Sequence, residues 1–243
     1  MVLASKERII ADRQFTTERF TLSTLPVLYV PLYRLDSGDS GGTFTSADGH
    51  GHTCTVTGAL WQLDGRLFDG NDDFIDCGRS PAFDMGTGNF SYVAWVKLTD
   101  VTGFPHILSK GAAGAGGRKY DLGFEQTTGK LRSVLNDSTG AVAYLATTDV
   151  SDGDWHYVGA SFNRTANVQH YLDGAIDGAA SDISAQSGSL DDTNKDLTIG
   201  VISDDETSNN FPGTISAIWL FKGISLSSLV HQQCYIATKW RYR

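Results

Sequence analysis

The stretch Asn89–Leu98, which reads NFSYVAWVKL, constrains the fold of this chain more than any other segment. Its side chains alternate with a period of two, which is the period of a β-strand. One face carries Phe90, Tyr92, Ala94, Val96 and Leu98. The other face carries Trp95 and is also apolar, so the segment is typical of a central strand covered on both sides, as in a sandwich of two sheets.

Other strand-like runs follow at short spacing, and glycine-bearing turns separate them. The chain has 27 glycines and only 5 prolines, which favours many tight turns. The dipeptide Asp173-Gly174 predicts a two-residue hairpin turn with positive φ. Pro31 places the first run at an edge or an end of a sheet. The runs are Val27–Tyr33, Thr53–Thr57, Arg118–Glu125, Lys130–Asn136, Ala141–Thr147, Asp154–Asn163, Asn167–Asp173, Leu197–Val201 and Thr214–Phe221.

The pattern divides the chain into three parts: an N-terminal arm over residues 1–24, an all-β body over 25–224, and a C-terminal helix with a basic tail over 225–243. Ser225 is the expected N-cap of that helix. Its expected apolar stripe consists of Leu226, Leu229, Val230, Cys234, Ala237 and Trp240. The arm has mixed charge and no glycine, and we expect it to dock on the body or on a neighbouring subunit. Its candidate contact residues are Arg13, Phe15, Arg19 and Phe20.

The composition excludes several classes of protein. A formal net charge of −9 disfavours binding to nucleic acid, because an acidic surface repels phosphates. The longest apolar run, 25–35, contains two prolines and an arginine, so no membrane-spanning segment is expected. The N-terminus carries charges where a secretory signal needs an apolar core. The three cysteines have no motif spacing and are expected to be buried free thiols.

Ten short blocks in order carry a family resemblance, among them TGALW at 57–61, FDGNDDF at 68–74, ILSKG at 107–111 and YLDG at 171–174. Over about residues 25–232 the chain resembles the laminin-G-like, or concanavalin A-like, jelly rolls of the single-domain type common in bacterial and phage proteins. The resemblance implies an all-β antiparallel β-sandwich. It also makes the acidic block at 68–74 mainly structural, with Phe68 and Phe74 facing the core around an Asp69-Gly70 turn.

No arrangement of residues predicts catalysis, and we expect a protein that is not an enzyme. Retaining glycosidases need two carboxyl groups about 5–5.5 Å apart, and the glucanase relatives place theirs along one strand. Glu125 has no acidic partner on its own strand. Ser151–Trp155 only superficially resembles a sialidase Asp-box and fits a strand entry better. His156 and His170 lie on neighbouring expected strands and are interpreted as packing or hydrogen-bonding groups.

No cofactor is expected to be required, and calcium is the metal that the sequence favours most. Calcium takes six to eight oxygen ligands, often from loops. The competing interpretation is that these aspartates belong to solvated turns. Relatives often carry an acidic residue in the strand where this chain has Ser216-Ala217, which weakens the analogy. The candidate ligands are Asp69, Asn71, Asp72, Asp73, Asp204 and Asp205.

A polysaccharide surface would need exposed aromatic side chains beside polar loops, and the alternative is that these side chains pack in the core. The candidates for contact with a glycan or a partner are Trp61, Phe104, Tyr144 and Phe211.

Two functions remain in competition, and the sequence favours the first over the second. The first is a non-catalytic structural or adhesive protein on the surface of a phage virion, as a capsid decoration or a fibre or tail component. Such a protein would need no secretory signal and would bind other subunits, of its own kind or of the capsid or tail, through its arm. The second is an extracellular lectin-like carbohydrate-binding module, with or without calcium.

Overall fold

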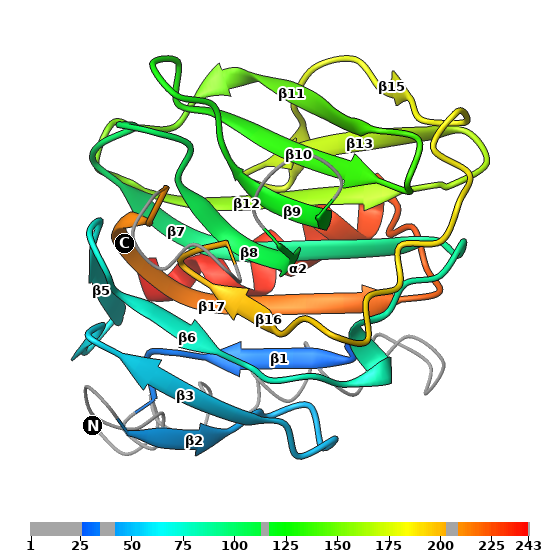
Figure 1. Ribbon diagram of the computed structural model, residues 1–243. Coiled ribbons are helices and arrows are strands. Elements are labelled where there is room, and N and C mark those ends of the chain that lie inside the picture. The colour runs from blue at the N-terminus through cyan, green and yellow to red at the C-terminus, as the bar shows by residue number, and fades with distance from the viewer. Residues whose placement is uncertain (1–25, 35–41, 113–116, 203–208, 243) are drawn as a thin grey trace.

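The strand β7 (Phe90–Leu98) lies inside a nine-stranded antiparallel sheet, as its two apolar faces predict. Figure 1 shows the computed structural model, in which two antiparallel sheets form a sandwich. The structure describes residues 26–34, 42–112, 117–202 and 209–242. The predicted arm contacts Arg13, Phe15, Arg19 and Phe20 lie outside these residues, so docking through the arm stays a prediction.

The nine-stranded sheet contains the longest strand of the described chain, β17 (Pro212–Lys222). Its order is β14 (Ala175–Ile176), β13 (Asn167–Leu172), β12 (Trp155–Phe162), β7, β17 (Pro212–Lys222), β5 (Gly65–Asp69) and β4 (Leu60–Gln62). Two further strands join this path: β1 (Leu28–Pro31) pairs with β17, and β15 (Ser181–Asp182) pairs with β13. Pro31 is the last residue of β1, in agreement with the sequence prediction.

The second sheet has eight strands in the order β11 (Ala141–Asp149), β10 (Lys130–Asn136), β9 (Arg118–Phe124), β8 (His106–Gly111), β16 (Leu197–Ile199), β6 (Phe74–Asp76), β3 (Thr53–Thr57) and β2 (Thr43–Thr45). A short 3₁₀ helix, η4 (Pro81–Phe83), follows β6 along the chain. The all-β sandwich is therefore confirmed.

The main core lies between the two sheets. As predicted, β7 contributes every second side chain to it: Phe90, Tyr92, Ala94, Val96 and Leu98. The Phe90 ring stacks on Phe162 of β12, with the ring centroids 4.2 Å apart. Phe68 is buried in this core as expected. The prediction for Phe74 is wrong, because Phe74 is only half-buried and the next residue, Ile75, faces the core instead.

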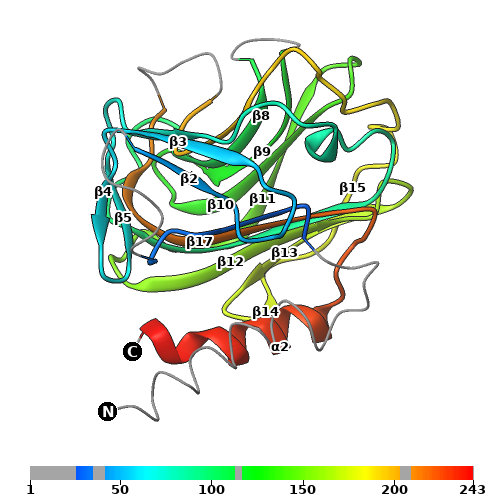
Figure 2. The same cartoon turned by 90° about the horizontal axis from the view of Figure 1, so that it is seen from below.

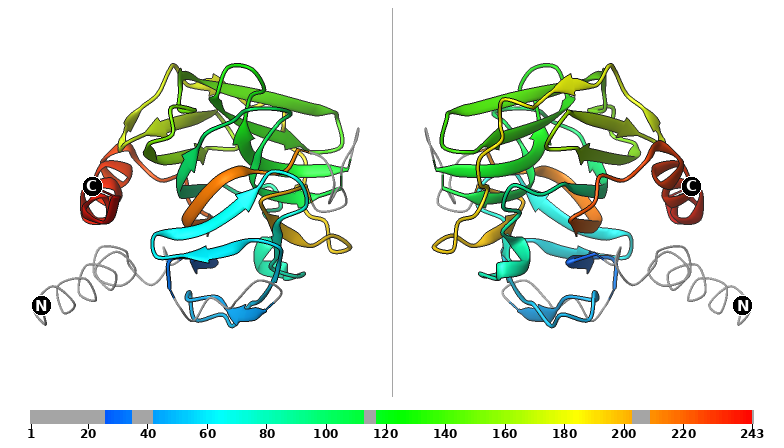
Figure 3. Two further views of the ribbon diagram at one scale, coloured as in Figure 1. Left: turned by 90° about the vertical axis from the view of Figure 1, so that its left-hand side faces the viewer. Right: turned by 90° about the vertical axis from the view of Figure 1, so that its right-hand side faces the viewer.

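The helix α2 (Ser228–Thr238) and the 3₁₀ helix η5 (Lys239–Tyr242) cover the outer face of the nine-stranded sheet (Figures 2 and 3). Beneath them, Trp95 stacks on Tyr242 at 4.0 Å between centroids and donates from its indole nitrogen to the Thr238 hydroxyl at 2.8 Å. The sequence placed the helix start two residues early, since the N-cap is Ser227, whose hydroxyl accepts from the Val230 amide.

The predicted apolar stripe of the helix is wrong at Leu229. This residue is 60% exposed, while Leu226 and Cys234 are buried.

The Asp173-Gly174 turn is confirmed: both residues have positive φ, 49° and 80°, and they join β13 directly to β14. In the described part of the chain, no helix combines the length and the apolar character that crossing a membrane requires.

Candidate functional site

Three loops that cross between the sheets leave the sandwich at the same end. The register of the nine-stranded sheet pairs Pro212, the start of β17, with Asp69, the end of β5. It also pairs Gly213 with Leu98, the end of β7. The three strand ends therefore lie side by side. We call residues 69–73, 99–105 and 209–211, which lie at or beside these three strand ends, the crossover rim.

Hydrogen bonds connect the three loops into one surface. The side-chain amide of Asn210 donates to the backbone carbonyl of Asn71 at 2.6 Å. The backbone amide of Phe104 donates to the side-chain oxygen of Asn209 at 3.0 Å. Asn209 adopts a φ of 58°, in the left-handed region that asparagine tolerates better than most residues. The consecutive asparagines thus hold the acidic loop on one side and the Phe104 loop on the other.

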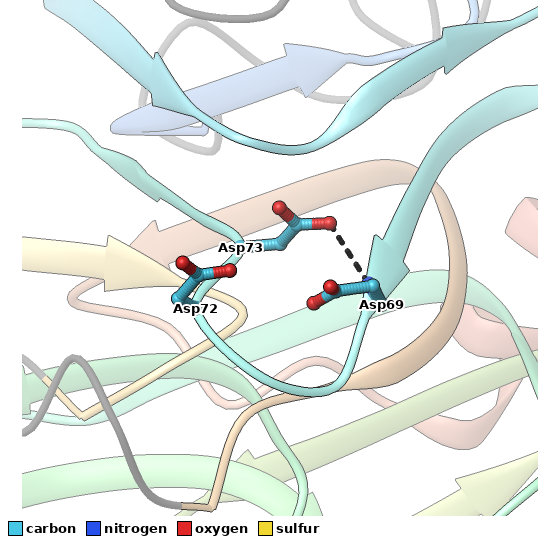
Figure 4. A group of neighbouring side chains, drawn as sticks. All are labelled: Asp69, Asp72 and Asp73. Atoms are coloured by element: carbon cyan, nitrogen blue, oxygen red, sulfur yellow. Dashed lines mark hydrogen bonds between the residues drawn. The ribbon is translucent and has the colours of Figure 1, made fainter.

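The acidic loop brings three carboxylates together on the turn between β5 and β6 (Figure 4). One oxygen from each of Asp69, Asp72 and Asp73 lies within 4.8 Å of the others. Asp69 and Asp72 are exposed, whereas only 6% of Asp73 is exposed. The Asp73 carboxylate accepts a hydrogen bond from the Asp69 backbone amide at 2.8 Å, and this bond fixes its orientation.

The pKa values of the neighbouring carboxyl groups are shifted in opposite directions. Burial raises the pKa of Asp73, and the charges of Asp69 and Asp72 raise it further. The pKa of Asp69 is lowered because the backbone amide and the side-chain amide of Asn71 donate to its carboxylate. At neutral pH the loop therefore concentrates negative charge in a small volume, at a cost in repulsion that a bound cation would relieve.

The donor set of this loop fits a hard divalent cation. Calcium prefers carboxylate and carbonyl oxygens, and three carboxylates can supply half or more of the six to eight ligands that it takes. Asn71 was predicted as a ligand, but its side-chain nitrogen donates to Asp69 and its carbonyl accepts from Asn210, so it supports the loop. The other two predicted ligands, Asp204 and Asp205, lie outside the described residues.

Phe104 adds an aromatic group to the rim. Phe104 is half-buried, and the guanidinium carbon of Arg132 lies 4.8 Å from the centroid of its ring. The guanidinium also pairs with Glu125, with 3.4 Å between Arg132 Nε and Glu125 Oε2. The residue that Glu125 pairs with, Arg132, comes from the adjacent strand β10 and is not the second carboxylate that a glycosidase would need.

The other three predicted contact aromatics do not join Phe104. Phe211 corrects the prediction: it is fully buried and packs edge-on against Phe68, with the rings at 84°. Trp61 is half-buried on β4 and donates to the Arg34 carbonyl at 3.1 Å. Tyr144 is half-buried on β11. β4 is an edge strand of the nine-stranded sheet, and β11 is an edge strand of the other sheet at the opposite side of the sandwich. Trp61 and Tyr144 therefore do not belong to one compact binding site.

The turn that follows β11 also reaches this end of the sandwich, since the Gly153 amide donates to the Leu98 carbonyl. Beside it, His156 contacts Asp173 at 3.0 Å and Asp152 at 3.2 Å. These carboxylates, Asp173 first, raise the pKa of His156. His170 contacts the Ser133 hydroxyl at 2.9 Å. Both histidines are therefore hydrogen-bonding groups, as the sequence predicted.

Similar folds occur in solved structures. Trypanosoma rangeli sialidase in complex with sialic acid is 12% identical, with a TM-score of 0.68 over 99% of this chain and 39% of that chain. The receptor binding domain of botulinum neurotoxin D is 14% identical, with a TM-score of 0.60 over 88% and 52% of the two chains. The binding domain of Paraclostridial Mosquitocidal Protein 1 is 11% identical, with a TM-score of 0.58 over 86% and 51%. At these identities the likeness concerns the fold alone.

The chain spans about two fifths of the length of the sialidase and about half of each toxin domain. No curated protein matches the sequence significantly. A family model described as the concanavalin A-like lectin/glucanases superfamily matches residues 69–228, which is more than half of the chain. Together with the observed sandwich, this match shows that the chain belongs to the concanavalin A-like lectin/glucanases superfamily.

Proposed function

We propose that this protein is a non-catalytic carbohydrate-binding module and that its ligand surface is the crossover rim. One observation carries the proposal: the rim places the half-buried Phe104 on the same hydrogen-bonded loop system as the acidic cluster. A sugar presents apolar C–H faces and polar hydroxyl edges. An aromatic ring beside oxygen-rich loops complements both, as is usual where a few polar groups orient a ligand.

The charge of the rim selects the class of glycan. Around Phe104 and the Arg132–Glu125 pair, the same end of the sandwich carries Asp69, Asp72, Asp73, Asp100, Asp152 and Asp154. Such a surface repels a sugar acid unless a cation lies between them. We therefore assign a neutral, hydroxyl-rich polysaccharide as the ligand. In this proposal calcium binds at Asp69, Asp72 and Asp73 and neutralises the rim; the ion is an aid to binding.

A hydrolase is the main competing function, and the acidic loop makes it worth testing. A raised pKa beside a lowered one is also how a glycosidase separates its acid from its base. The burial of Asp73 and its hydrogen bond from the Asp69 amide argue against that role, because a general acid must reach the glycosidic oxygen. Glu125, the other carboxylate near Phe104, is engaged by Arg132.

The test is a binding screen of the full chain against neutral and acidic polysaccharides, with calcium or with a chelator. Three variants accompany the wild type: Phe104→Ala, the double variant D69N/D72N, and the control Tyr144→Leu. Tyr144 is half-buried like Phe104 but lies on β11, away from the rim. We expect Phe104→Ala to weaken binding of a neutral glycan at least tenfold and Tyr144→Leu to leave it unchanged.

The calcium part of the proposal has its own readout in the same screen. D69N/D72N should remove the effect of the chelator while leaving stacking on Phe104 intact. Equal loss of binding in Phe104→Ala and Tyr144→Leu would contradict the rim as the ligand surface. Release of reducing sugars that Asp73→Asn abolishes would favour the hydrolase instead.

A further inference from the structure

Two of the three cysteines face each other across neighbouring strands. The pairing of β3 with β6 sets Thr55 opposite Asp76, and the same register sets Cys54 opposite Cys77, one residue beyond the strand. The two Sγ atoms are 3.5 Å apart. Both thiols are buried, and both belong to the core between the sheets. Each is therefore the nearest reaction partner that the fold offers to the other.

The backbone geometry suits a covalent link. Directly opposed residues on antiparallel strands have Cα atoms about 4.5–5.5 Å apart, within the ~4.4–6.8 Å range of disulfides. Bond formation needs the sulfur atoms to close from 3.5 Å to ~2.05 Å, a movement that rotation of the two side chains can supply. Cys234 is not a competitor, because it belongs to the separate cluster beneath α2, on the other side of the nine-stranded sheet.

The surroundings make the folded dithiol slow to react. The contact with Cys54 raises the pKa of Cys77 well above its ordinary value, and burial raises it further. Since the thiolate is the nucleophile in disulfide exchange, very little of Cys77 is in its reactive form at neutral pH. The folded core also excludes oxidants. Oxidation should therefore be fast while the strands are forming and slow once the sandwich has closed.

We propose that Cys54 and Cys77 are a site of covalent modification, joined as an intramolecular disulfide when the chain folds in the presence of a small-molecule disulfide such as oxidised glutathione. One thiolate attacks the glutathione disulfide, which releases one glutathione and leaves a mixed disulfide. The second cysteine then attacks the mixed disulfide and releases the other glutathione. Two protein thiols are oxidised, one glutathione disulfide is reduced to two thiols, and the S–S bond closes across β3 and β6.

The link would enclose the acidic loop. The segment between the two cysteines contains Gly58 and the whole turn that carries Asp69, Asp72 and Asp73. A disulfide here restricts the unfolded chain and ties β6, the strand that follows that turn, to β3. For a loop of this size we expect an increase in Tm of about 5–10 °C. This inference does not depend on the glycan proposal.

The experiment refolds the full chain in a buffer of reduced and oxidised glutathione and alkylates the remaining thiols. Mass spectrometry of the intact protein should show a loss of about 2 Da and one alkylated cysteine, and digestion should give a linked peptide pair containing Cys54 and Cys77. Treatment of the already folded protein should give the same product far more slowly. Reduction should reverse both the mass change and the gain in Tm.

Cys234→Ser is the matched control and should oxidise like the wild type, with no free thiol left. Cys54→Ser and Cys77→Ser should each fail to form the link. The peptide map of the wild type keeps the inference falsifiable even if those two variants fold poorly. Alkylation of both Cys54 and Cys77 after refolding, or a link from either of them to Cys234, would overturn it.

Discussion

Acidification should destabilise the protein through a buried histidine on α2. His231 stacks on Tyr171, with ring centroids 3.7 Å apart. Its Nδ1 contacts the Tyr157 hydroxyl at 3.0 Å and its Nε2 contacts the Ser161 hydroxyl at 2.8 Å. Both contacts suit a neutral imidazole, which has one donor and one acceptor. Burial lowers the pKa of His231 to about 3, so the ring stays neutral in the folded protein.

The sign and size of the effect follow from the two pKa values. In the unfolded chain the histidine titrates near 6.5, whereas in the folded protein it titrates near 3. Below pH 6.5 the unfolded state therefore binds more protons, and the free energy of unfolding falls by about 1.4 kcal/mol per pH unit. Between pH 7.5 and pH 5.0 this amounts to about 2 kcal/mol for His231. His170, whose pKa is lowered to about 4, adds a similar loss.

His156 works in the opposite direction, because its raised pKa stabilises the folded state as the pH falls through that region. A comparison of variants isolates the contribution of His231 from those of the other histidines. Glutamine can hydrogen-bond to the two hydroxyls but does not titrate, so His231→Gln is the suitable replacement.

The assay is urea unfolding of the wild type and His231→Gln at pH 7.5 and pH 5.0, followed by tryptophan fluorescence. We expect the wild type to lose about 2 kcal/mol more than the variant over this interval, whatever the difference in their stabilities at pH 7.5. Equal losses in the two proteins would refute the conclusion that the fold holds His231 neutral.

Four further predictions concern the hydrogen bond between Trp95 and Thr238, the acidic loop and the arm. Thr238→Val leaves the buried Trp95 indole without its acceptor and should cost about 1–3 kcal/mol in urea unfolding, while Thr238→Ser should cost less. Gly58→Ala should unfold more easily than Gly49→Ala, because both glycines have positive φ but only at Gly58 would the new Cβ meet Asp73, 1.7 Å from its Oδ1. Calcium affinity, measured by calorimetry, should fall as the pH is lowered. Because the pKa of Asp73 is raised, this fall should begin at a higher pH than it would for a site made of aspartates with ordinary pKa values. The variant Asp73→Asn should bind calcium weakly at every pH. If the arm assembles subunits, alanine replacements in the full chain should lower the solution mass measured by light scattering, and an unchanged mass would contradict that role. The residues to replace are Arg13, Phe15, Arg19 and Phe20.

The features that sequence predicted well depend on local periodicity and turn chemistry. The two apolar faces of β7 follow from an alternation within nine residues. The Asp173-Gly174 hairpin follows from the ability of these two residues to adopt positive φ. The family resemblance added the type of sandwich, a concanavalin A-like jelly roll, which periodicity alone does not provide.

The features that sequence missed depend on contacts between distant segments. Phe211 lies in a polar-looking stretch, but its ring is buried because it meets Phe68 from another strand. The partnership of Glu125 with Arg132 crosses a turn, and the bond from Asn210 to Asn71 joins residues 139 positions apart. Two consecutive asparagines before an aromatic residue are too common a pattern to predict a binding surface. The crossover rim could be identified only from the pairing register of β5, β7 and β17.

The most direct test of the ligand surface is a nuclear magnetic resonance titration of the isotopically labelled full chain with neutral oligosaccharides, in calcium and in a chelator. The account predicts that the largest amide shifts fall on Asn71, Gly103, Phe104 and Asn210, with only small shifts on β4 and β11. Larger shifts around Trp61 or Tyr144 than on the rim, or no shifts with any neutral oligosaccharide, would contradict the proposal that this rim binds carbohydrate.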